Sequence, residues 1–238
     1  MKTREAVILA GGMGTRLNPV VPDRPKPMAE INGRPFLEYL LDFLTGQGIE
    51  KIILSVGFRH QMILSHFGSS YKNAVLLYAV ENFPMGTGGG IRNALANVSS
   101  EKVFIVNGDT FFRISLAIME EEFNRNNADM MLALHPVSDP GRYGNVITGA
   151  DGRILRFAEK TEATGTSLIN GGIYLMKKDI FSEFDFPAAF SLEKEFLEKN
   201  AGTLRFFGIS FDTDFIDIGI PETYRQASFF FGNEEIAK

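Results

Sequence analysis

The sequence predicts an α/β fold in which helices flank a doubly wound mixed sheet. In the first half of the chain, short apolar runs typical of strands buried on both faces alternate with helical stripes, which is the pattern of parallel β-α-β units. In the second half, strand-like runs surround the turn sequence Ala150-Asp151-Gly152, which favours a hairpin and hence antiparallel strands. We therefore expect one sheet that is parallel at first and mixed later.

The elements follow from the apolar spacing in chain order. Strands of the first half are predicted at Val7–Leu9, Lys51–Val56, Val75–Tyr78, Lys102–Val106 and Met130–Leu134. Helices between them are predicted at Pro35–Leu44, His60–Phe67 and Gly89–Asn97. In the second half we predict strands at Val146–Thr148, Ile154–Phe157, Ile173–Met176 and Arg205–Ile209, and a helix around Leu192–Asn200.

Composition limits the function classes. The chain has 238 residues, of which 45% are hydrophobic and 22% charged, as in an ordinary globular domain. A net charge of −5 argues against a nucleic-acid or membrane-surface binder. The absence of cysteine excludes disulfides, thiol catalysis and zinc–thiolate sites. No apolar run approaches the ~20 residues that span a bilayer, and no signal peptide is evident, so we expect a cytoplasmic protein.

A glycine-rich loop follows the first predicted strand. Gly11, Gly12 and Gly14 lack the Cβ atoms that would keep a phosphate away from the backbone, and Arg16 adds a fork of donors. The spacing fits neither the dinucleotide fingerprint nor a Walker loop. Lys26 follows between two prolines that stiffen its segment, and we interpret it as a phosphate ligand rather than a solvated lysine.

A second glycine cluster, Gly86-Thr87-Gly88-Gly89-Gly90, precedes a predicted helix. Two interpretations of this cluster are a flexible turn and a backbone that contacts a flat ligand such as a base.

Two aspartates are candidate metal ligands. Asp109 ends an apolar strand, and Asp217 is a lone acid among apolar residues. Each could be a turn residue, but together they could share one Mg²⁺.

The remaining polar signals are weaker. Glu159, Lys160 and Asn170 suit sugar hydroxyls and an anomeric phosphate, although the first two could be a solvated pair.

The histidines show no metal-ligand spacing, and we interpret them as surface or loop residues: His60, His66 and His135. For Phe229-Phe230-Phe231 we favour core packing, with a homo-oligomer contact as the alternative.

The ordered set of motifs resembles the sugar-phosphate nucleotidyltransferases, also called nucleotidyl pyrophosphorylases. The matching stretches are Leu-Ala-Gly-Gly-Met-Gly-Thr-Arg-Leu (9–17), Pro-Lys-Pro-Met (25–28), Gly-Thr-Gly-Gly (86–89), Asn-Gly-Asp (107–109), Phe-Ala-Glu-Lys (157–160), Asn-Gly-Gly (170–172) and Asp-Ile-Gly-Ile-Pro-Glu (217–222). The resemblance implies a Rossmann-like nucleotide-diphospho-sugar transferase fold. It also implies one domain over 1–238, with a nucleotide-binding half at about 1–112 and a sugar-binding half at about 113–238.

The implied reaction joins a nucleoside triphosphate to a sugar 1-phosphate, with Mg²⁺, and releases pyrophosphate. The resemblance gives the catalytic roles to Arg16 and Lys26 on the triphosphate and to Lys160 on the sugar phosphate. The implied metal ligands are Asp109 and Asp217. The implied nucleotide contacts are Gly11, Gly12, Gly14, Thr15, Arg16, Lys26, Glu81, Gly86, Thr87 and Gly88. The implied sugar-phosphate contacts are Tyr143, Gly144, Glu159, Lys160, Asn170 and Gly171.

Within the family, stretches such as Asn-Gly-Asp-Thr-Phe-Phe (107–112) and Leu-Ile-Asn-Gly-Gly-Ile-Tyr (168–174) resemble most the guanylyltransferases acting on D-glycero-α-D-manno-heptose 1-phosphate, whose products feed bacterial surface glycans. One departure concerns a position just before the metal aspartate. Many relatives place an aromatic such as tryptophan there, whereas this chain contains no tryptophan and has Phe215. Two alternatives stay open. One is a uridylyl- or thymidylyltransferase acting on another sugar, such as N-acetylmuramic acid 1-phosphate. The other is a non-catalytic sugar-nucleotide sensor.

Overall fold

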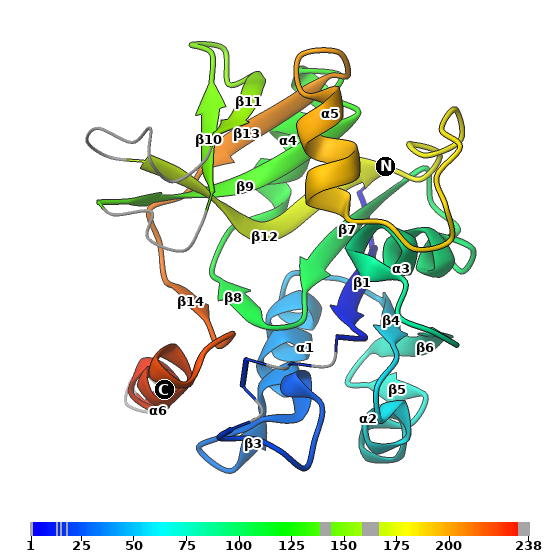
Figure 1. The fold of residues 1–238 in the computed structure, drawn as a ribbon, viewed down its shortest axis with the longest axis vertical. Helices are drawn as coiled ribbons and strands as arrows, with labels where there is room; N and C mark the ends of the chain where they lie inside the picture. The colour runs from blue at the N-terminus through cyan, green and yellow to red at the C-terminus, as the bar shows by residue number, and fades with distance from the viewer. Residues whose placement is uncertain are drawn as a thin grey trace.

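The computed structural model describes residues 2–12, 14, 16–17, 19–138, 144–158 and 167–232. Within these residues the strands form one large mixed sheet, with helices on both of its faces (Figure 1). The path of hydrogen-bonded strands runs β11-β10-β12-β7-β1-β4-β6-β5, and β9 pairs with β12 and with β13. This is the α/β architecture that the sequence predicts.

The strands of the large sheet are β1 (Glu5–Ala10), β4 (Lys51–Val56), β5 (Ser70–Tyr71), β6 (Ala74–Val80), β7 (Lys102–Asn107), β9 (Met130–Val137), β10 (Asn145–Thr148), β11 (Ile154–Ala158), β12 (Ser167–Lys177) and β13 (Phe206–Ser210). Two small sheets pair β2 (Glu30–Ile31) with β3 (Arg34–Pro35), and β8 (Thr110–Phe112) with β14 (Phe215–Asp217). The helices are α1 (Phe36–Gly46), α2 (His60–Phe67), α3 (Gly86–Leu95), α4 (Leu116–Arg125), α5 (Glu198–Asn200) and α6 (Pro221–Gly232). A 3₁₀ turn, η1 (Lys26–Met28), and a π-helical stretch, η3 (Leu192–Leu197), complete the described elements.

The strand directions change along the sheet as the sequence predicts. β1 pairs in parallel with β4 and β7, and β4 pairs in parallel with β6. β12 then runs antiparallel to both β7 and β9, and the predicted hairpin is formed by β10 and β11. Every predicted strand falls on an observed one, although the short strands β2, β3, β5, β8 and β14 were not anticipated.

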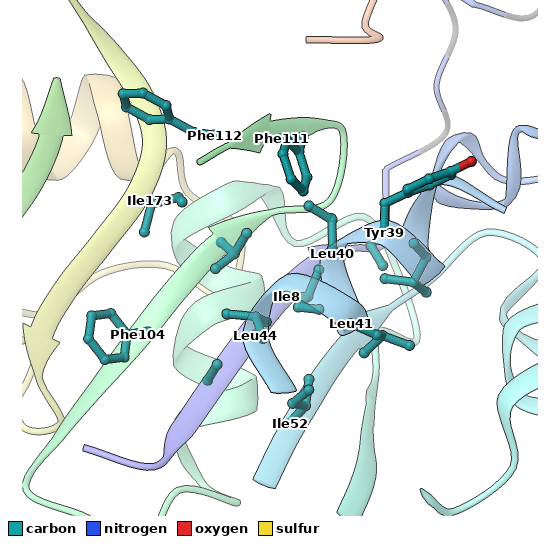
Figure 2. Close-up of a cluster of buried hydrophobic side chains, with 14 of the residues drawn as sticks. Ile8, Tyr39, Leu40, Leu41, Leu44, Ile52, Phe104, Phe111, Phe112 and Ile173 are labelled. Atoms are coloured by element: carbon teal, nitrogen blue, oxygen red, sulfur yellow. The ribbon is translucent and has the colours of Figure 1, made fainter. Parts of the chain in front are cut away.

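Side chains on the two faces of the sheet belong to two separate cores. Along β1, Ile8 packs into a core with α1, whereas its neighbour Val7 packs on the opposite face with α3. Figure 2 shows the first of these cores, where Leu40 and Leu44 of α1 lie against Ile8. Burial of each such side chain contributes about 1.5–3 kcal/mol to the free energy of folding. Because neighbouring residues of a strand point to opposite faces, this stabilises the packing of helices on both faces of the sheet.

The carboxyl ends of the parallel strands meet at one edge of the sheet. Ala10 pairs with Val56, and Leu9 pairs with Asn107, so all three strands end side by side. The chains that leave this edge pass very close to one another. A Cβ atom on Gly108 would lie 2.3 Å from the Leu9 carbonyl oxygen, so only glycine fits there. Open α/β sheets bind ligands beyond such an edge.

The second glycine cluster is helical rather than a loop. α3 begins at Gly86, three residues earlier than predicted, so the cluster forms its first turn. A Cβ atom on Gly88 would lie 2.2 Å from Cε2 of Phe190, and one on Gly89 would lie 2.6 Å from the Ala188 carbonyl oxygen. Close packing against the segment before η3 therefore explains the lack of side chains at Gly88 and Gly89. The predicted contact of this cluster with a base stays a prediction.

The phenylalanine run at the end of α6 divides between core and surface. Phe231 is 3% exposed and stacks on Tyr39, with ring centroids 4.0 Å apart, and Phe230 packs edge-on against Phe111. These two confirm the predicted core packing. Phe229 does not, because it is 79% exposed.

The prediction for the histidines is also wrong in one case. His135 is half-buried on the strand β9 and stacks on Phe215, with ring centroids 4.8 Å apart, so it is neither a loop residue nor fully exposed. Among the described residues, no helix is long and apolar enough to cross a membrane.

Candidate active site

Two adjoining cavities lie beyond the carboxyl ends of the parallel strands. The first has a volume of about 570 Å³ and is lined by the glycine loop after β1 and by the start of α3. The second, of about 340 Å³, is lined mainly by polar side chains. Asn107 and Asp109 line both, so a molecule in one cavity can meet a molecule in the other at these residues.

Glycines of the loop after β1 form one wall of the first cavity, and their predicted contact with a nucleotide stays a prediction. Gly11, Gly12 and Gly14 all line it. A Cβ atom on Gly11 would lie 2.2 Å from Oε1 of Glu81, so the bare backbone there makes room for a carboxylate. Gly14 has a φ of +62°, a backbone conformation that favours glycine. Thr15 lies outside the described residues.

Glu81, which follows β6, is held in place from two sides. The Ser55 hydroxyl donates to Oε1 at 3.0 Å, and the Met85 backbone N–H donates to Oε2 at 3.2 Å. The residue lines the first cavity together with Gly86 and Thr87. The cavity therefore presents a fixed carboxylate beside its glycine wall.

Lys26 and Asp109 form an ion pair at the junction of the two cavities. The Lys26 Nζ lies 2.7 Å from Oδ2 of Asp109, and the Lys26 side chain is only 11% exposed. Lys26 occupies the first position of η1, and the adjoining Pro25 and Pro27 fix the local backbone. The lysine is thus aimed at the carboxylate that the sequence assigns to a metal.

Strand pairing brings the second aspartate to the same place. β14 runs antiparallel to β8 with Asp217 opposite Thr110, and the Ile218 N–H donates to the Asp109 carbonyl oxygen at 2.9 Å. Asp109 and Asp217 both line the second cavity. Two carboxylates beside an open cavity are the donor set that Mg²⁺ prefers, because the remaining positions can hold water or phosphate oxygens. No group of three or more metal-ligating side chains occurs in the part of the chain that the structure describes.

The second cavity combines hydrogen-bonding groups of several kinds. Asn170 and Tyr174 of β12 line it, and the Asn170 amide donates to the Tyr174 hydroxyl at 2.7 Å. Burial of Tyr174, together with the nearby charge of Glu193, raises the pKa of the phenol well above its ordinary value of 10.0, so the hydroxyl stays protonated. Such a lining suits a ligand rich in hydroxyl groups.

The predicted residues do not all line a cavity. Arg16 lines the second cavity, as does Gly144. Gly171 lines neither, and a Cβ atom there would lie 2.4 Å from Cδ1 of Phe112, so its lack of a side chain is explained by packing. Gly88 likewise packs against Phe190. Tyr143, Glu159 and Lys160 lie outside the described residues, so their predicted roles stay predictions.

Sequence reasoning missed several cavity residues. Asn107 belongs to a motif that was recognised, but its side chain was not singled out. Phe58 and Phe83 line the first cavity and carried no motif. Glu193 lines the second cavity, although its local sequence is that of an ordinary amphipathic helix. Its position in the cavity depends on the tertiary structure, in which η3 contacts α3.

Comparison with known proteins defines the class. A family model described as nucleotidyl transferase matches residues 5–229, which is nearly the whole chain. The chain therefore belongs to the nucleotidyl transferase family, in agreement with the resemblance of its motifs and with the two cavities.

Individual relatives have more specific descriptions than the family model. The chain is 45% identical to the D-glycero-alpha-D-manno-heptose 1-phosphate guanylyltransferase of Aneurinibacillus thermoaerophilus, over 94% of this chain and 96% of that protein. It is 42% identical to the enzyme of the same description from Campylobacter jejuni, over 92% and 96%. The crystal structure of HddC from Yersinia pseudotuberculosis complexed with GMP-PN is similar at a TM-score of 0.85 and 36% identity, over 96% of this chain and 100% of that one.

Proposed function

We propose that this enzyme transfers a guanylyl group from GTP to D-glycero-α-D-manno-heptose 1-phosphate, giving GDP-heptose and pyrophosphate. The observation that carries the proposal is the pair of adjoining cavities that share Asp109, one lined by the glycine loop and one lined by polar side chains. The near full-length similarity to two heptose 1-phosphate guanylyltransferases supports this pair of substrates. The product would serve as an activated sugar for surface glycan synthesis.

The two cavities divide the substrates between them. GTP occupies the first, with its phosphates beside Gly11, Gly12 and Gly14, where the lack of side chains lets an anion approach the backbone. The sugar phosphate occupies the second, where Asn170 contacts sugar hydroxyls. The residues outside the described part keep the roles that the motifs imply, namely Lys160 on the sugar phosphate and Glu159 on a hydroxyl.

Glu81 gives a physical reason for guanine. A carboxylate accepts hydrogen bonds, and guanine offers N1–H and the exocyclic amino group side by side on one edge. Uracil and thymine each offer a single ring N–H. Because the carboxylate is fixed by Ser55 and Met85, it is preorganised to accept from both guanine donors.

A divalent cation, which we take to be Mg²⁺, fits Asp109 and Asp217 by the chemistry of the donor set. When bound there, it would neutralise phosphate charge. Lys26 contributes a fixed positive charge at the same place, because its ammonium group is already held 2.7 Å from Asp109.

The chemistry is an in-line attack of a sugar phosphate oxygen on the α-phosphorus of GTP. The P–O bond to the leaving pyrophosphate breaks as the new P–O bond forms, so no covalent enzyme intermediate is needed. The task of the protein is to bring two anions together and to offset the charge that accumulates. We assign Lys26 to the triphosphate and Arg16 to the leaving pyrophosphate.

A matrix of four nucleoside triphosphates against several sugar 1-phosphates, scored by pyrophosphate release, tests the proposal. We expect release with GTP and the heptose 1-phosphate at a kcat/KM about 100-fold above that with UTP or dTTP. Activity with UTP alone would support the uridylyl alternative, and no turnover with any pair would support the non-catalytic sensor.

A further inference from the structure

Glu193 is a charged residue of the second cavity to which the proposed reaction gives no role. It lies in η3, is half-buried, and lines the cavity together with Asn170 and Tyr174. Figure 1 shows the helix formed by η3 and α5, in orange, near α3, and the two elements are in contact. Glu193 thus lies where the wall of the sugar cavity meets the helix that borders the nucleotide cavity.

Hydrogen bonds hold this carboxylate through one of its oxygens. Oε2 accepts from the Thr87 hydroxyl at 2.7 Å and from the Ser191 hydroxyl at 2.9 Å. The Thr87 oxygen in turn accepts from the Leu192 backbone N–H at 2.8 Å. Within the described residues, both of these hydrogen bonds reach Oε2 and none reaches Oε1, so the carboxylate keeps acceptor capacity at Oε1.

The charge of Glu193 limits which part of a ligand can lie beside it. The same cavity holds the carboxylates of Asp109 and Asp217, and Arg16 is a cation of its lining. A phosphate group is repelled by a carboxylate, whereas a hydroxyl can donate to it in a charge-assisted hydrogen bond. A sugar 1-phosphate is therefore favoured with a hydroxyl, and not its phosphate, toward Glu193.

We infer that Glu193 is a specificity-determining residue, whose carboxylate accepts a hydrogen bond from a hydroxyl of the sugar 1-phosphate and so selects and orients the sugar. This inference rests on the proposed sugar 1-phosphate reaction. Thr87 and Ser191 act as positioning residues, because they fix the carboxylate without touching the sugar.

The test compares Glu193→Ala and Glu193→Gln with Glu198→Gln, which removes an exposed charge from the same helical segment. We expect Glu193→Ala to raise the KM for the heptose 1-phosphate about ten-fold, because a hydrogen bond to a charged group is lost. Glu193→Gln should raise it less. The KM for GTP in Glu193→Gln, and both KM values in Glu198→Gln, should stay close to those of the unsubstituted enzyme.

Monodeoxy analogues of the sugar 1-phosphate separate recognition from a structural effect. In the unsubstituted enzyme, the analogue that lacks the recognised hydroxyl should show a raised KM. In Glu193→Ala that analogue and the parent sugar should have equal KM values, since the partner is already missing. A raised KM with every analogue-to-parent ratio preserved would overturn the inference. If Glu193→Ala does not fold, the same ratios are measured in Glu193→Gln, where the ratio for that analogue should be smaller than in the unsubstituted enzyme and an unchanged ratio would overturn the inference.

The inference and the proposed function fail separately. If the unsubstituted enzyme ignores the heptose 1-phosphate and uses another sugar 1-phosphate, the proposed substrate is wrong, and the same deoxy series on that sugar still tests Glu193. If the heptose 1-phosphate is the substrate but its KM is unchanged in both Glu193 variants, the inference alone is wrong.

Discussion

At the scale of single residues, Asp109 connects the two cavities of the candidate active site. Its carboxylate pairs with Lys26, lines both cavities, and lies beside the strand that carries Asp217. We therefore expect Asp109 to affect the charge next to both substrates. Its place at the end of an apolar strand suggested a metal-binding role from the sequence, whereas the direct ion pair with Lys26 depends on tertiary structure.

We predict that Asp109→Asn lowers kcat about 10²–10³-fold, because preorganised charge is needed mainly in the transition state. GTP should still bind in part, since the glycine loop is unchanged. Steady-state kinetics and nucleotide binding by calorimetry measure the two effects. The matched control is Asp212→Asn, an exposed aspartate outside both cavities. Near-normal turnover of Asp109→Asn would refute the metal assignment.

A substitution of Glu81 tests whether this residue recognises the base of the nucleotide. Glu81→Gln keeps the shape but replaces one acceptor oxygen with a donor, so it should lower kcat/KM for GTP at least about ten-fold. The GTP-to-UTP ratio should fall with it. A variant whose preference for GTP over UTP is unchanged would show that the base is read elsewhere. In the glutamate, each carboxylate oxygen accepts one hydrogen bond, from Ser55 or from Met85, and the glutamine keeps only one of these acceptors. Thermal melting of the variant verifies that the fold is retained despite this loss.

At the scale of elements, periodicity predicted the long strands and α1 well, because each buries a regular apolar pattern. It placed the start of α3 three residues too late, because the glycines suggested a loop. The helix forms because the bare faces of Gly88 and Gly89 allow it to pack closely against Phe190 and Ala188, and that contact depends on a distant segment. It also missed β8 and β14, whose short pairing brings Asp109 and Asp217 together. Local sequence contains no signal for such a pairing.

Helix α6 provides a matched pair of substitutions for its packing. Phe231→Ala should lower the free energy of unfolding by about 3–5 kcal/mol, because the ring is buried between Tyr39 and Phe111. Phe229→Ala, two residues earlier in the same helix and 79% exposed, should change it by less than about 0.5 kcal/mol. Chemical denaturation of both variants gives the values. Equal losses would contradict the division of this run into core and surface, and destabilisation by Phe229→Ala alone would indicate that its ring is covered in an oligomer.

At the scale of the whole molecule, buried ion pairs tie the large sheet to its surroundings. Glu5 of β1 is 8% exposed. Burial alone would raise its pKa, but hydrogen bonds from Ser100, Lys51 and Ser99 outweigh that effect and hold the pKa at about 2, below the ordinary 4.5. Glu120 is also buried and has a lowered pKa, because hydrogen bonds from Lys102 and Thr3 outweigh burial in the same way.

These shifts predict acid sensitivity. A carboxylate with a lowered pKa in the folded state stabilises the protein above its ordinary pKa of 4.5, and this contribution is lost as the pH falls toward about 2. The melting temperature should therefore drop steeply over that interval. In Glu5→Gln the drop should be smaller, and in Glu183→Gln, an exposed control, it should match the unsubstituted protein. Identical pH profiles for all three would contradict the role of Glu5.

The most direct test of the whole account follows a label at the α-phosphorus of GTP. With D-glycero-α-D-manno-heptose 1-phosphate and Mg²⁺ present, we predict that the label appears in a nucleotide sugar and that unlabelled pyrophosphate is released in equal amount. Formation of labelled product should require the sugar phosphate. Label that remains in GTP, or that appears in GMP whether or not the sugar phosphate is added, would contradict a two-cavity guanylyltransferase.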